Sequence, residues 1–359
     1  MSVSNLRFLS SRQALNDIAT FALGMKVKYN VPNAKVITFG GSYPGALSAW
    51  FRLKYPHISN GAVATSGPLR AKVDFSEYLE VVAASLKSYS SKCLQTVADA
   101  TQAISQLYSN GTQAKIDEFS KALGLCAKLD TTKPLDVSNF YSTLAGSLMD
   151  TVQYSNDNRG IAANILTIPK VCDILTAVNV TSAMQRYVNV QNYYIKANNE
   201  TCFDFSYEKE VEELKNETWN GGSSRQWIYQ TCTEFGYYQS SDSPNQPFGH
   251  NFGGRFSQRI CSDVFGSSFT YQFTQNAARE TNIYYGAKEI AVTKVIFPNG
   301  SLDPWHVLGL TNATAAERPT IYIQGTAHCA NMYPPRKEDI PSLNSARQMI
   351  TQYLNAWLN

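Results

Sequence analysis

The chain has 359 residues, 43% of them hydrophobic and only 16% charged, and its formal net charge is +3. This is enough apolar material for a sizeable core, and the small, unclustered charge argues against a nucleic-acid-binding protein. No apolar run approaches the ~20 residues needed to cross a membrane, so the composition also argues against a membrane-spanning protein.

Residues 6–30 predict a helix, because apolar side chains such as Ala14, Ile18 and Ala22 recur at helical spacing. No basic start, apolar stretch and cleavage site precede this helix, so the sequence shows no secretion signal. The next segment, 36–41, is apolar and β-branched, which predicts a strand.

Ser42 follows this strand in the sequence Phe-Gly-Gly-Ser-Tyr-Pro-Gly, and a helical stretch comes next. The pattern is typical of a nucleophile elbow, where a sharp turn from strand to helix exposes a serine hydroxyl. Gly40, Gly41 and Gly45 supply the small neighbours that such a turn needs. The match to G-x-S-x-G is imperfect because Pro44 stands two residues after the serine, and a plain turn that opens a core helix is the alternative.

The middle of the chain has helical rather than alternating periodicity. After a short strand at 61–65, at least five helices are expected, around residues 75–82, 93–108, 116–123, 137–149 and from 171 onward. We interpret residues 69–238 as a helical cap inserted into a discontinuous core of residues 1–68 and 239–359. The Ser- and Pro-rich segment 240–247 is the most loop-like and marks the return to the core.

Two further strands precede polar residues in the last third of the chain. Residues 294–297 lead into a turn that carries Asp303, and residues 320–323 lead through Gly325 to His328. A nucleophile, an acid and a base in this order, each just after a strand, is the arrangement of α/β-hydrolases. In that arrangement the imidazole takes the proton of the serine, and the carboxylate fixes the tautomer of the imidazole.

His328 is selected as the base by elimination among four histidines. His57 follows a predicted helix as an end or surface residue, and His250 follows no strand. His306 lies only three residues after Asp303, too close to approach it from a separate loop. A structural role for His328 is the alternative.

The blocks 40–43, 299–305 and 325–329 together resemble the three catalytic blocks of the prolylcarboxypeptidase-like serine peptidases. That family includes lysosomal Pro-Xaa carboxypeptidase, dipeptidyl peptidase II and thymus-specific serine protease. The cysteine after His328 is most similar to the thymus-specific branch. Three further blocks agree, at 9–15, 49–56 and 230–238, so the resemblance covers essentially the whole chain.

The resemblance implies an α/β fold, an α/β-hydrolase core with an inserted helical cap, and a peptidase that works through an acyl-enzyme. Ser42 matches the nucleophile of the family, Asp303 its acid and His328 its base. The amide of Tyr43 is placed to stabilise the tetrahedral intermediate. No metal or organic cofactor is implied, the expected partners are peptide substrates, and a homodimer is compatible with the resemblance.

Members of the family carry further strands before the segment at which the resemblance begins. We therefore expect an N-terminally truncated version of a larger secreted enzyme, which lacks the first strands of the sheet and the second oxyanion amide. Loss of one oxyanion donor typically costs ~10²–10³ in turnover, so the activity of this shortened polypeptide stays open.

Seven cysteines without C-x-x-C spacing argue for disulfides and against zinc. Their spacing leaves the connectivity open, whereas the family pattern implies three pairs and leaves Cys329 over. A cysteine mechanism at Cys329 is disfavoured because the elbow carries Ser42. The implied pairs are Cys93–Cys172, Cys126–Cys202 and Cys232–Cys261.

Six Asn-x-Ser/Thr triplets in a chain of low charge favour a glycosylated protein that is secreted or lysosomal/endosomal. Asn299 lies too close to Asp303 for us to expect a glycan there. We expect modification at Asn110, Asn179, Asn199, Asn216 and Asn312.

A preference for proline before the scissile bond is carried over from the family. A proline ring needs a flat, aromatic-walled slot, and Trp305 is placed to line one. Glu234, Tyr237 and Trp227 are candidates for recognising a peptide terminus, with ordinary core packing as the alternative. Glu234 favours recognition of an amino terminus, as in a dipeptidyl peptidase, because a Pro-Xaa carboxypeptidase needs a cation instead.

Two other functions stay open. An esterase of the same fold shares the triad, and short-acyl ester turnover without peptide cleavage would identify it. A non-catalytic homologue binds peptides without cutting them, and it would not react with a fluorophosphonate probe.

Overall fold

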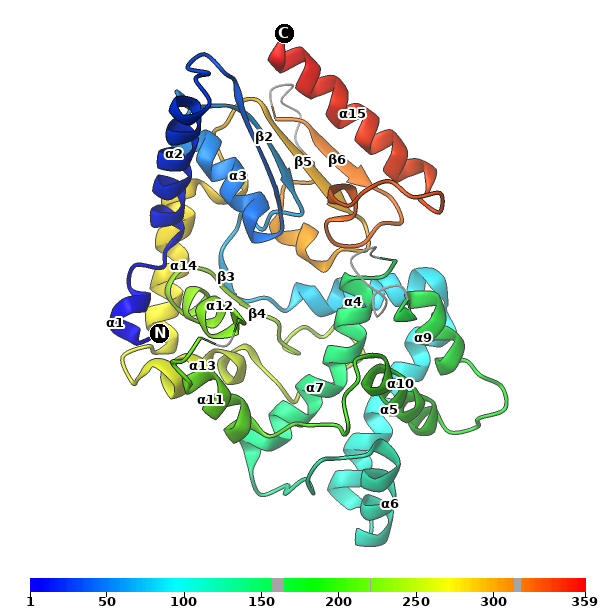
Figure 1. The fold of residues 1–359 in the computed structure, drawn as a ribbon. Helices are drawn as coiled ribbons and strands as arrows, with labels where there is room; N and C mark the ends of the chain where they lie inside the picture. The colour runs from blue at the N-terminus through cyan, green and yellow to red at the C-terminus, as the bar shows by residue number, and fades with distance from the viewer. Residues whose placement is uncertain (157–164, 220, 313–317) are drawn as a thin grey trace. The chain divides into compact units, whose positions relative to one another are not determined.

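Figure 1 shows the computed structural model of the chain, which describes residues 1–156, 165–219, 221–312 and 318–359. The chain divides into two compact units. Unit 1 comprises Met1–Val73, Leu214–Tyr237 and Cys261–Asn359, and unit 2 comprises Asp74–Glu213 and Tyr238–Ile260.

Unit 1 is built around a parallel sheet with the strand order β1-β2-β5-β6. Its strands are β1 (Val36–Gly41), β2 (Ser59–Thr65), β5 (Val295–Gly300) and β6 (Thr320–Ile323). The inner strand β5 is buried along its whole length, as expected for a parallel strand with both faces covered. The carboxyl ends of all four strands therefore meet at one edge, where the loops that follow them gather.

Helices cover both faces of this sheet (Figure 1). Leu343, Ala346 and Ile350 of α15 (Pro341–Leu358) pack on a layer of β-branched side chains from β2, β5 and β6. Helix α3 (Tyr43–Lys54) packs on β1 and β2 from the other side. The helix predicted at 6–30 is α2 (Ser11–Lys28), and a separate short helix, α1 (Val3–Leu6), precedes it. The prediction started too early because the side chain of Ser10 caps α2 by accepting a hydrogen bond from the Gln13 amide.

Shorter elements complete unit 1. They are α12 (Ser224–Gln230), η1 (Thr231–Phe235), α14 (Tyr271–Tyr285), η2 (Ala287–Glu289), η3 (Pro304–Leu308) and η4 (Ala330–Met332). A two-stranded sheet pairs β3 (Lys72–Asp74) with β4 (Gly236–Tyr238). Two helices run on from one unit into the other along the chain, α11 (Tyr207–Lys215) and α13 (Gly254–Phe265).

Unit 2 is helical, as the periodicity of the middle region predicts. Its helices are α4 (Glu77–Tyr89), α5 (Ser91–Asn110), α6 (Gln113–Leu123), α7 (Pro134–Gln153), α9 (Ile168–Leu175) and α10 (Ala183–Ala197). The turn after α6 uses Gly124 in the left-handed conformation, with φ at 69°, which a side chain would disfavour.

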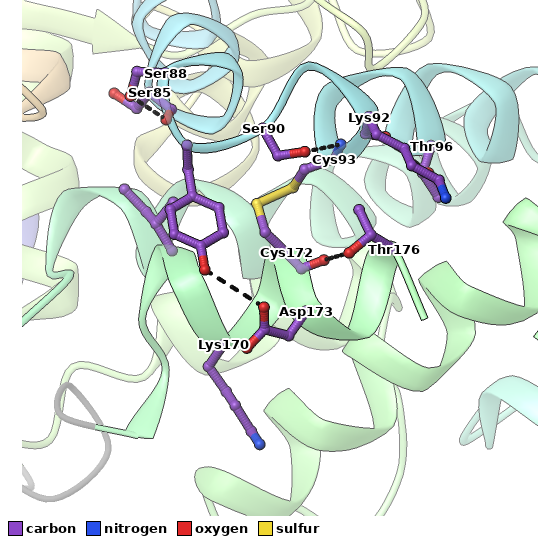
Figure 2. The surroundings of a disulfide bond; sticks show 12 residues. Ser85, Ser88, Ser90, Lys92, Cys93, Thr96, Lys170, Cys172, Asp173 and Thr176 are labelled. Atoms are coloured by element: carbon purple, nitrogen blue, oxygen red, sulfur yellow. Dashed lines mark hydrogen bonds between the residues drawn. A yellow bond between two sulfur atoms is a disulfide. The ribbon is translucent and has the colours of Figure 1, made fainter. Parts of the chain in front are cut away.

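Three disulfides have the pairing that the family resemblance implies: Cys93–Cys172, Cys126–Cys202 and Cys232–Cys261. Figure 2 shows the first, which joins the opening turn of α5 to α9. Ser90 begins α5 there, since its hydroxyl accepts a hydrogen bond from the Cys93 amide at 3.3 Å. The first two bridges close loops of 79 and 76 residues within unit 2, which limits its unfolded ensemble.

The observed units differ from the predicted insertion at 69–238. Residues 214–237 belong to unit 1, where the Cys232–Cys261 disulfide and the packing of η1 on α14 hold them. Residues 238–260 belong to unit 2, where Ser240 donates a hydrogen bond to Asp74 and Ser243 donates one to Glu80 at 2.5 Å. The predicted return segment 240–247 contains no helix or strand.

Candidate active site

Ser42 lies in a strained turn between β1 and α3. Its backbone has φ at 67° and ψ at −134°, a conformation that L residues rarely adopt and that is typical of a nucleophile elbow. Close backbone approaches explain the glycines around it. A Cβ on Gly40 would lie 1.9 Å from the carbonyl oxygen of Pro44, and one on Gly45 would lie 2.4 Å from that of Thr65.

Pro44 fits the elbow because it occupies the first turn of α3, where a missing N–H is tolerated. Tyr43 is the first residue of the same helix, so its amide has no intrahelical acceptor. The amide that follows Ser42 is thus at a helix N-terminus, the position that an oxyanion hole uses.

Asp303 and His328 form a buried pair at the carboxyl ends of β5 and β6. Nδ1 of His328 lies 2.9 Å from Oδ1 of Asp303, and the two side chains are 5% and 0% exposed. The amide of Trp305 donates a second hydrogen bond to the same carboxylate oxygen at 3.0 Å. These contacts fix the carboxylate toward the imidazole, so Nδ1 carries the proton and Nε2 is left as the basic nitrogen.

The surroundings of His328 also shift its pKa. Burial lowers the pKa of His328, but the negative charge of Asp303, the electrostatic interaction with Cys329 and the hydrogen bonds that the imidazole makes with both side chains outweigh it and hold the pKa well above 6.5. A pKa displaced by burial and a specific charged partner is typical of catalytic groups.

The histidine loop lies directly against the nucleophile loop. A Cβ on Gly41 would lie 2.9 Å from Sγ of Cys329 and 3.4 Å from Cγ of Met332, so a side chain there would displace these neighbours. Ser42 and His328 are the immediate chain neighbours of these two touching residues. The sequence-predicted nucleophile and base are therefore on adjoining loops at the same edge of the sheet.

The other three histidines occupy other surroundings. His57 is exposed, and Nδ1 of His250 lies 2.9 Å from the carbonyl oxygen of Ser241. His306 does approach Asp303, yet its Nδ1 contacts the backbone oxygen at 2.6 Å and not the carboxylate. Burial lowers the pKa of His306.

Four of the predicted residues form a continuous aromatic cluster with Phe235. The rings of Tyr43 and Trp227 are 5.8 Å apart, and Trp227 stacks on Tyr237 at 6.4 Å. Tyr237 meets Trp305 edge-on at 5.3 Å, and the indole of Trp305 is 6.4 Å from the ring of His328. We call Tyr43, Trp227, Phe235, Tyr237 and Trp305 the aromatic cluster.

The side chain of Glu234 makes hydrogen bonds with Ser11 and Gln230. Both of its carboxylate oxygens accept hydrogen bonds from the Ser11 amide at 2.9 Å, and Oε1 also accepts one from the Ser11 hydroxyl at 2.5 Å. Gln230 donates to Glu234 at 3.2 Å and to the Tyr43 hydroxyl at 3.0 Å, which links the two. Burial raises the pKa of Glu234, while these hydrogen bonds and Arg12 oppose the shift. Glu234 thus holds the start of α2.

Sequence reasoning missed two features of the site. The first is the pair Gln230 and Ser11, which lie in the resembling blocks 230–238 and 9–15 without a predicted role and which meet at Glu234 only after folding. The second is the Thr65–Ser66 pair at the end of β2, whose hydrogen bonds reach the loops around it. Two small polar residues directly after a predicted buried strand were the available signal.

Within the described ranges, no group of three or more His, Cys, Asp or Glu residues is arranged to hold a metal ion. No helix among the same residues is long and apolar enough to span a bilayer.

Comparison with known proteins places these features in context. Residues 1–350 match a protein family described as "Serine carboxypeptidase S28". The chain is 36% identical to the thymus-specific serine protease of Mus musculus over 369 residues, which are 100% of this chain and 71% of that protein. The Homo sapiens protein of the same name is 34% identical over 372 residues, 100% of this chain and 70% of that protein. The lysosomal Pro-X carboxypeptidase of Bos taurus is 27% identical over 368 residues, 99% of this chain and 70% of that protein.

Proposed function

The chain belongs to the serine carboxypeptidase S28 family, and we propose that it is an exopeptidase that cleaves after proline through an acyl-enzyme on Ser42. The observation that carries the proposal is the buried pair of His328 and Asp303, whose Nδ1 and Oδ1 atoms are 2.9 Å apart. The loop that carries His328 touches the elbow of Ser42. An elbow, a base and a buried acid on adjoining loops are the parts that acyl transfer requires.

In the proposed mechanism Oγ of Ser42 attacks the scissile carbonyl carbon while Nε2 of His328 takes the hydroxyl proton. Asp303 holds Nδ1–H and stabilises the imidazolium, and the Tyr43 amide donates a hydrogen bond to the oxyanion. The C–N bond then breaks, and His328 gives its proton to the leaving amine. Water attacks the acyl-enzyme by the same route, which releases the acid product and restores the serine.

The proposed selectivity for proline is supported by the aromatic cluster. Its rings extend from His328 to Tyr43, so the face of an apolar ring bound next to Ser42 would meet aromatic walls. Three relatives carry the name lysosomal Pro-X carboxypeptidase, which agrees with this assignment. The indole of Trp305 lies 6.4 Å from the imidazole of His328, and we assign Trp305 to the slot.

A fluorophosphonate probe tests the nucleophile. We expect it to label the wild-type protein and C329A but not S42A, because the proposed acyl group forms on the serine. Labelling that survives S42A, or that disappears in C329A alone, would favour a cysteine mechanism. A wild-type protein that stays unlabelled is a non-catalytic homologue.

Peptide substrates test the reaction class and the recognised terminus. Cleavage of Xaa-Pro-Xaa peptides, but not of the matched Xaa-Ala-Xaa peptides, is expected; turnover confined to short-acyl esters would indicate an esterase. Acetylation of the amino terminus abolishes cleavage by a dipeptidyl peptidase, whereas amidation of the carboxyl terminus abolishes cleavage by a Pro-Xaa carboxypeptidase.

We also propose that the protein acts in the secretory or lysosomal compartment. The three disulfides need an oxidising environment to form, and all five asparagines expected to carry glycans are exposed.

A further inference from the structure

Thr65 and Ser66 occupy the centre of the sheet edge at which the triad residues gather. Thr65 is the last residue of β2 and Ser66 is the first residue after it; β2 lies between the nucleophile strand β1 and the acid strand β5. Both residues are 0% exposed, so neither is available to solvent or to a protein partner. Buried polar groups at such a position must be satisfied by the surrounding loops.

On one side the pair holds the nucleophile loop. The Ser42 amide donates a hydrogen bond to the carbonyl oxygen of Thr65 at 3.0 Å. The opening of α3 also rests on this carbonyl, since a Cβ on Gly45 would lie only 2.4 Å from it. The backbone of Thr65 therefore fixes both the residue that carries the hydroxyl and the helix that follows.

On the other side the pair holds the histidine loop. The Cys329 amide donates to Oγ of Ser66 at 3.0 Å, in a fully buried contact. Nδ2 of Asn331 donates to Oγ1 of Thr65 at 2.9 Å. These two side-chain acceptors are the direct polar link from β2 to the residues immediately after His328.

The pair also contacts the strand that leads to the acid. The Ser66 amide donates to the carbonyl oxygen of Pro298 in β5 at 2.8 Å. The loops of Ser42 and His328, and the strand that leads to Asp303, are thus connected to two consecutive residues.

The backbone at this junction is strained. Ser42, Ser66 and Cys329 have φ values of 67°, 47° and 59°, all in the left-handed region that residues with a Cβ avoid. The amides of Ser42 and Cys329 donate hydrogen bonds to the carbonyl oxygen of Thr65 and to the hydroxyl of Ser66, respectively. Strained conformations persist only where the surroundings over-determine them, and they gather at functional sites.

We propose that Thr65 and Ser66 are positioning residues that hold the Ser42 and His328 loops in register. The proposal rests on the proposed function of the triad. The hydrogen bonds of the pair join it to backbone amides of the two loops and to the Asn331 side chain, so each residue acts through the loop that it binds. A displacement of about 1 Å between reacting groups can cost ~10²-fold in rate, so loss of either acceptor should appear in turnover and not in binding.

Isosteric substitutions test the pair. T65V removes only the acceptor for Asn331, while T65S keeps it. S66A and S66G both remove the acceptor for the Cys329 amide, and S66G also relieves the positive φ. We expect T65V, S66A and S66G to lose roughly 10- to 100-fold in kcat with little change in KM, and T65S to stay near wild type.

S59A is the matched control. Ser59 is 1% exposed at the opposite end of β2, and its hydroxyl donates to the Gly61 carbonyl at 3.1 Å. The S59A variant loses a buried hydrogen bond of the same strand, and we expect the loops of Ser42 and His328 to keep their positions. Equal losses of kcat in S59A and S66A, at equal losses of Tm, would overturn the positioning role, and so would wild-type kcat in folded T65V and S66A.

A spectroscopic readout separates this proposal from the proposed function. The proton on Nδ1 of His328, held by Asp303, gives a far-downfield proton resonance whose shift reports the geometry of the pair. We expect that resonance to move or broaden in S66A and T65V and to stay in S59A and T65S. A protein that the fluorophosphonate probe never labels would overturn the proposed function, whereas an unmoved resonance in S66A and T65V would overturn the positioning role.

Discussion

At the scale of single residues, the charge of Asp303 decides how His328 titrates. Burial alone favours the neutral imidazole, but the carboxylate 2.9 Å away favours the charged form and raises the pKa well above 6.5. The histidine can accept the serine proton only when it is neutral. The acid limb of the pH–rate profile should therefore report this raised pKa.

We expect kcat/KM on an Xaa-Pro peptide to rise with pH through a midpoint above 6.5. In D303N the burial remains while the counter-charge is gone, so the midpoint should move to lower pH and kcat should fall on the order of 10³–10⁴-fold. A wild-type midpoint below 6.5, or one that D303N leaves in place, would contradict the assignment of this pair.

The same shift predicts how stability depends on pH. A group whose folded-state pKa is raised stabilises the fold fully below its unfolded value and loses that contribution as the pH rises through the raised pKa. The Tm difference between wild type and D303N should thus be largest below pH 6.5 and shrink above it. Differential scanning calorimetry across this range measures it.

Glu234 gives the second residue-scale prediction. Its carboxylate accepts three hydrogen bonds from Ser11, so E234A should lower the free energy of unfolding by ~1–3 kcal/mol, and E234Q, which keeps one oxygen acceptor, should lose less. We expect E234Q to leave KM unchanged for peptides with free or acetylated amino termini. A rise in KM confined to peptides with a free amino terminus would assign Glu234 to terminus recognition instead.

At the scale of elements, local chemistry made the strands of unit 1 predictable. The apolar runs at 36–41 and 294–297 coincide with β1 and with the start of β5, and the candidate residues Ser42 and Asp303 follow these strands. The start of α2 was less predictable, because its anchor is Glu234, 223 residues away in the chain. Glu234 itself lies in the π-helical turn η1, and a single π-helical turn cannot be recognised from the spacing of apolar residues in the sequence.

The Thr65–Ser66 junction shows the same limit. Each partner that defines it comes from a different loop, and Cys329 is 263 residues from Ser66. A sequence pattern reports what a residue prefers locally, whereas Ser66 and Cys329 adopt backbone conformations that they disfavour locally. Strained functional geometry is therefore the part of a site that sequence reasoning reaches last.

The disulfide between α5 and α9 gives the element-scale prediction. Because Cys93 and Cys172 are 79 residues apart, the chain-entropy account expects C93S/C172S to lose ~4 kcal/mol of unfolding free energy. The bridge Cys232–Cys261 spans only 29 residues, so C232S/C261S should lose ~1 kcal/mol less. Urea denaturation of both double variants tests the order. A larger loss in C232S/C261S would show that native-state packing, and not loop length, sets the effect.

At the scale of the whole molecule, the asparagines of the six Asn-x-Ser/Thr triplets differ in exposure: one is buried and five are exposed. Asn299 is 1% exposed, and its side-chain amide donates to the Leu310 carbonyl at 3.0 Å. The remaining five sequon asparagines are exposed, and they occur in both units. A low charged fraction of 16% leaves solubility dependent on other polar groups, and surface glycans are strongly solubilising.

Glycan occupancy can be counted by intact mass. For protein expressed through a secretory pathway, glycosidase treatment should remove glycans from the exposed asparagines and none from Asn299. N110Q should reduce the mass shift by one glycan, because Asn110 is exposed after α5. N299Q should leave the shift unchanged while lowering Tm, since it disturbs a buried hydrogen bond next to the Asp303 loop. An unchanged mass after glycosidase, or one glycan fewer in N299Q, would contradict this distribution and with it the folded environment assigned to the acid strand.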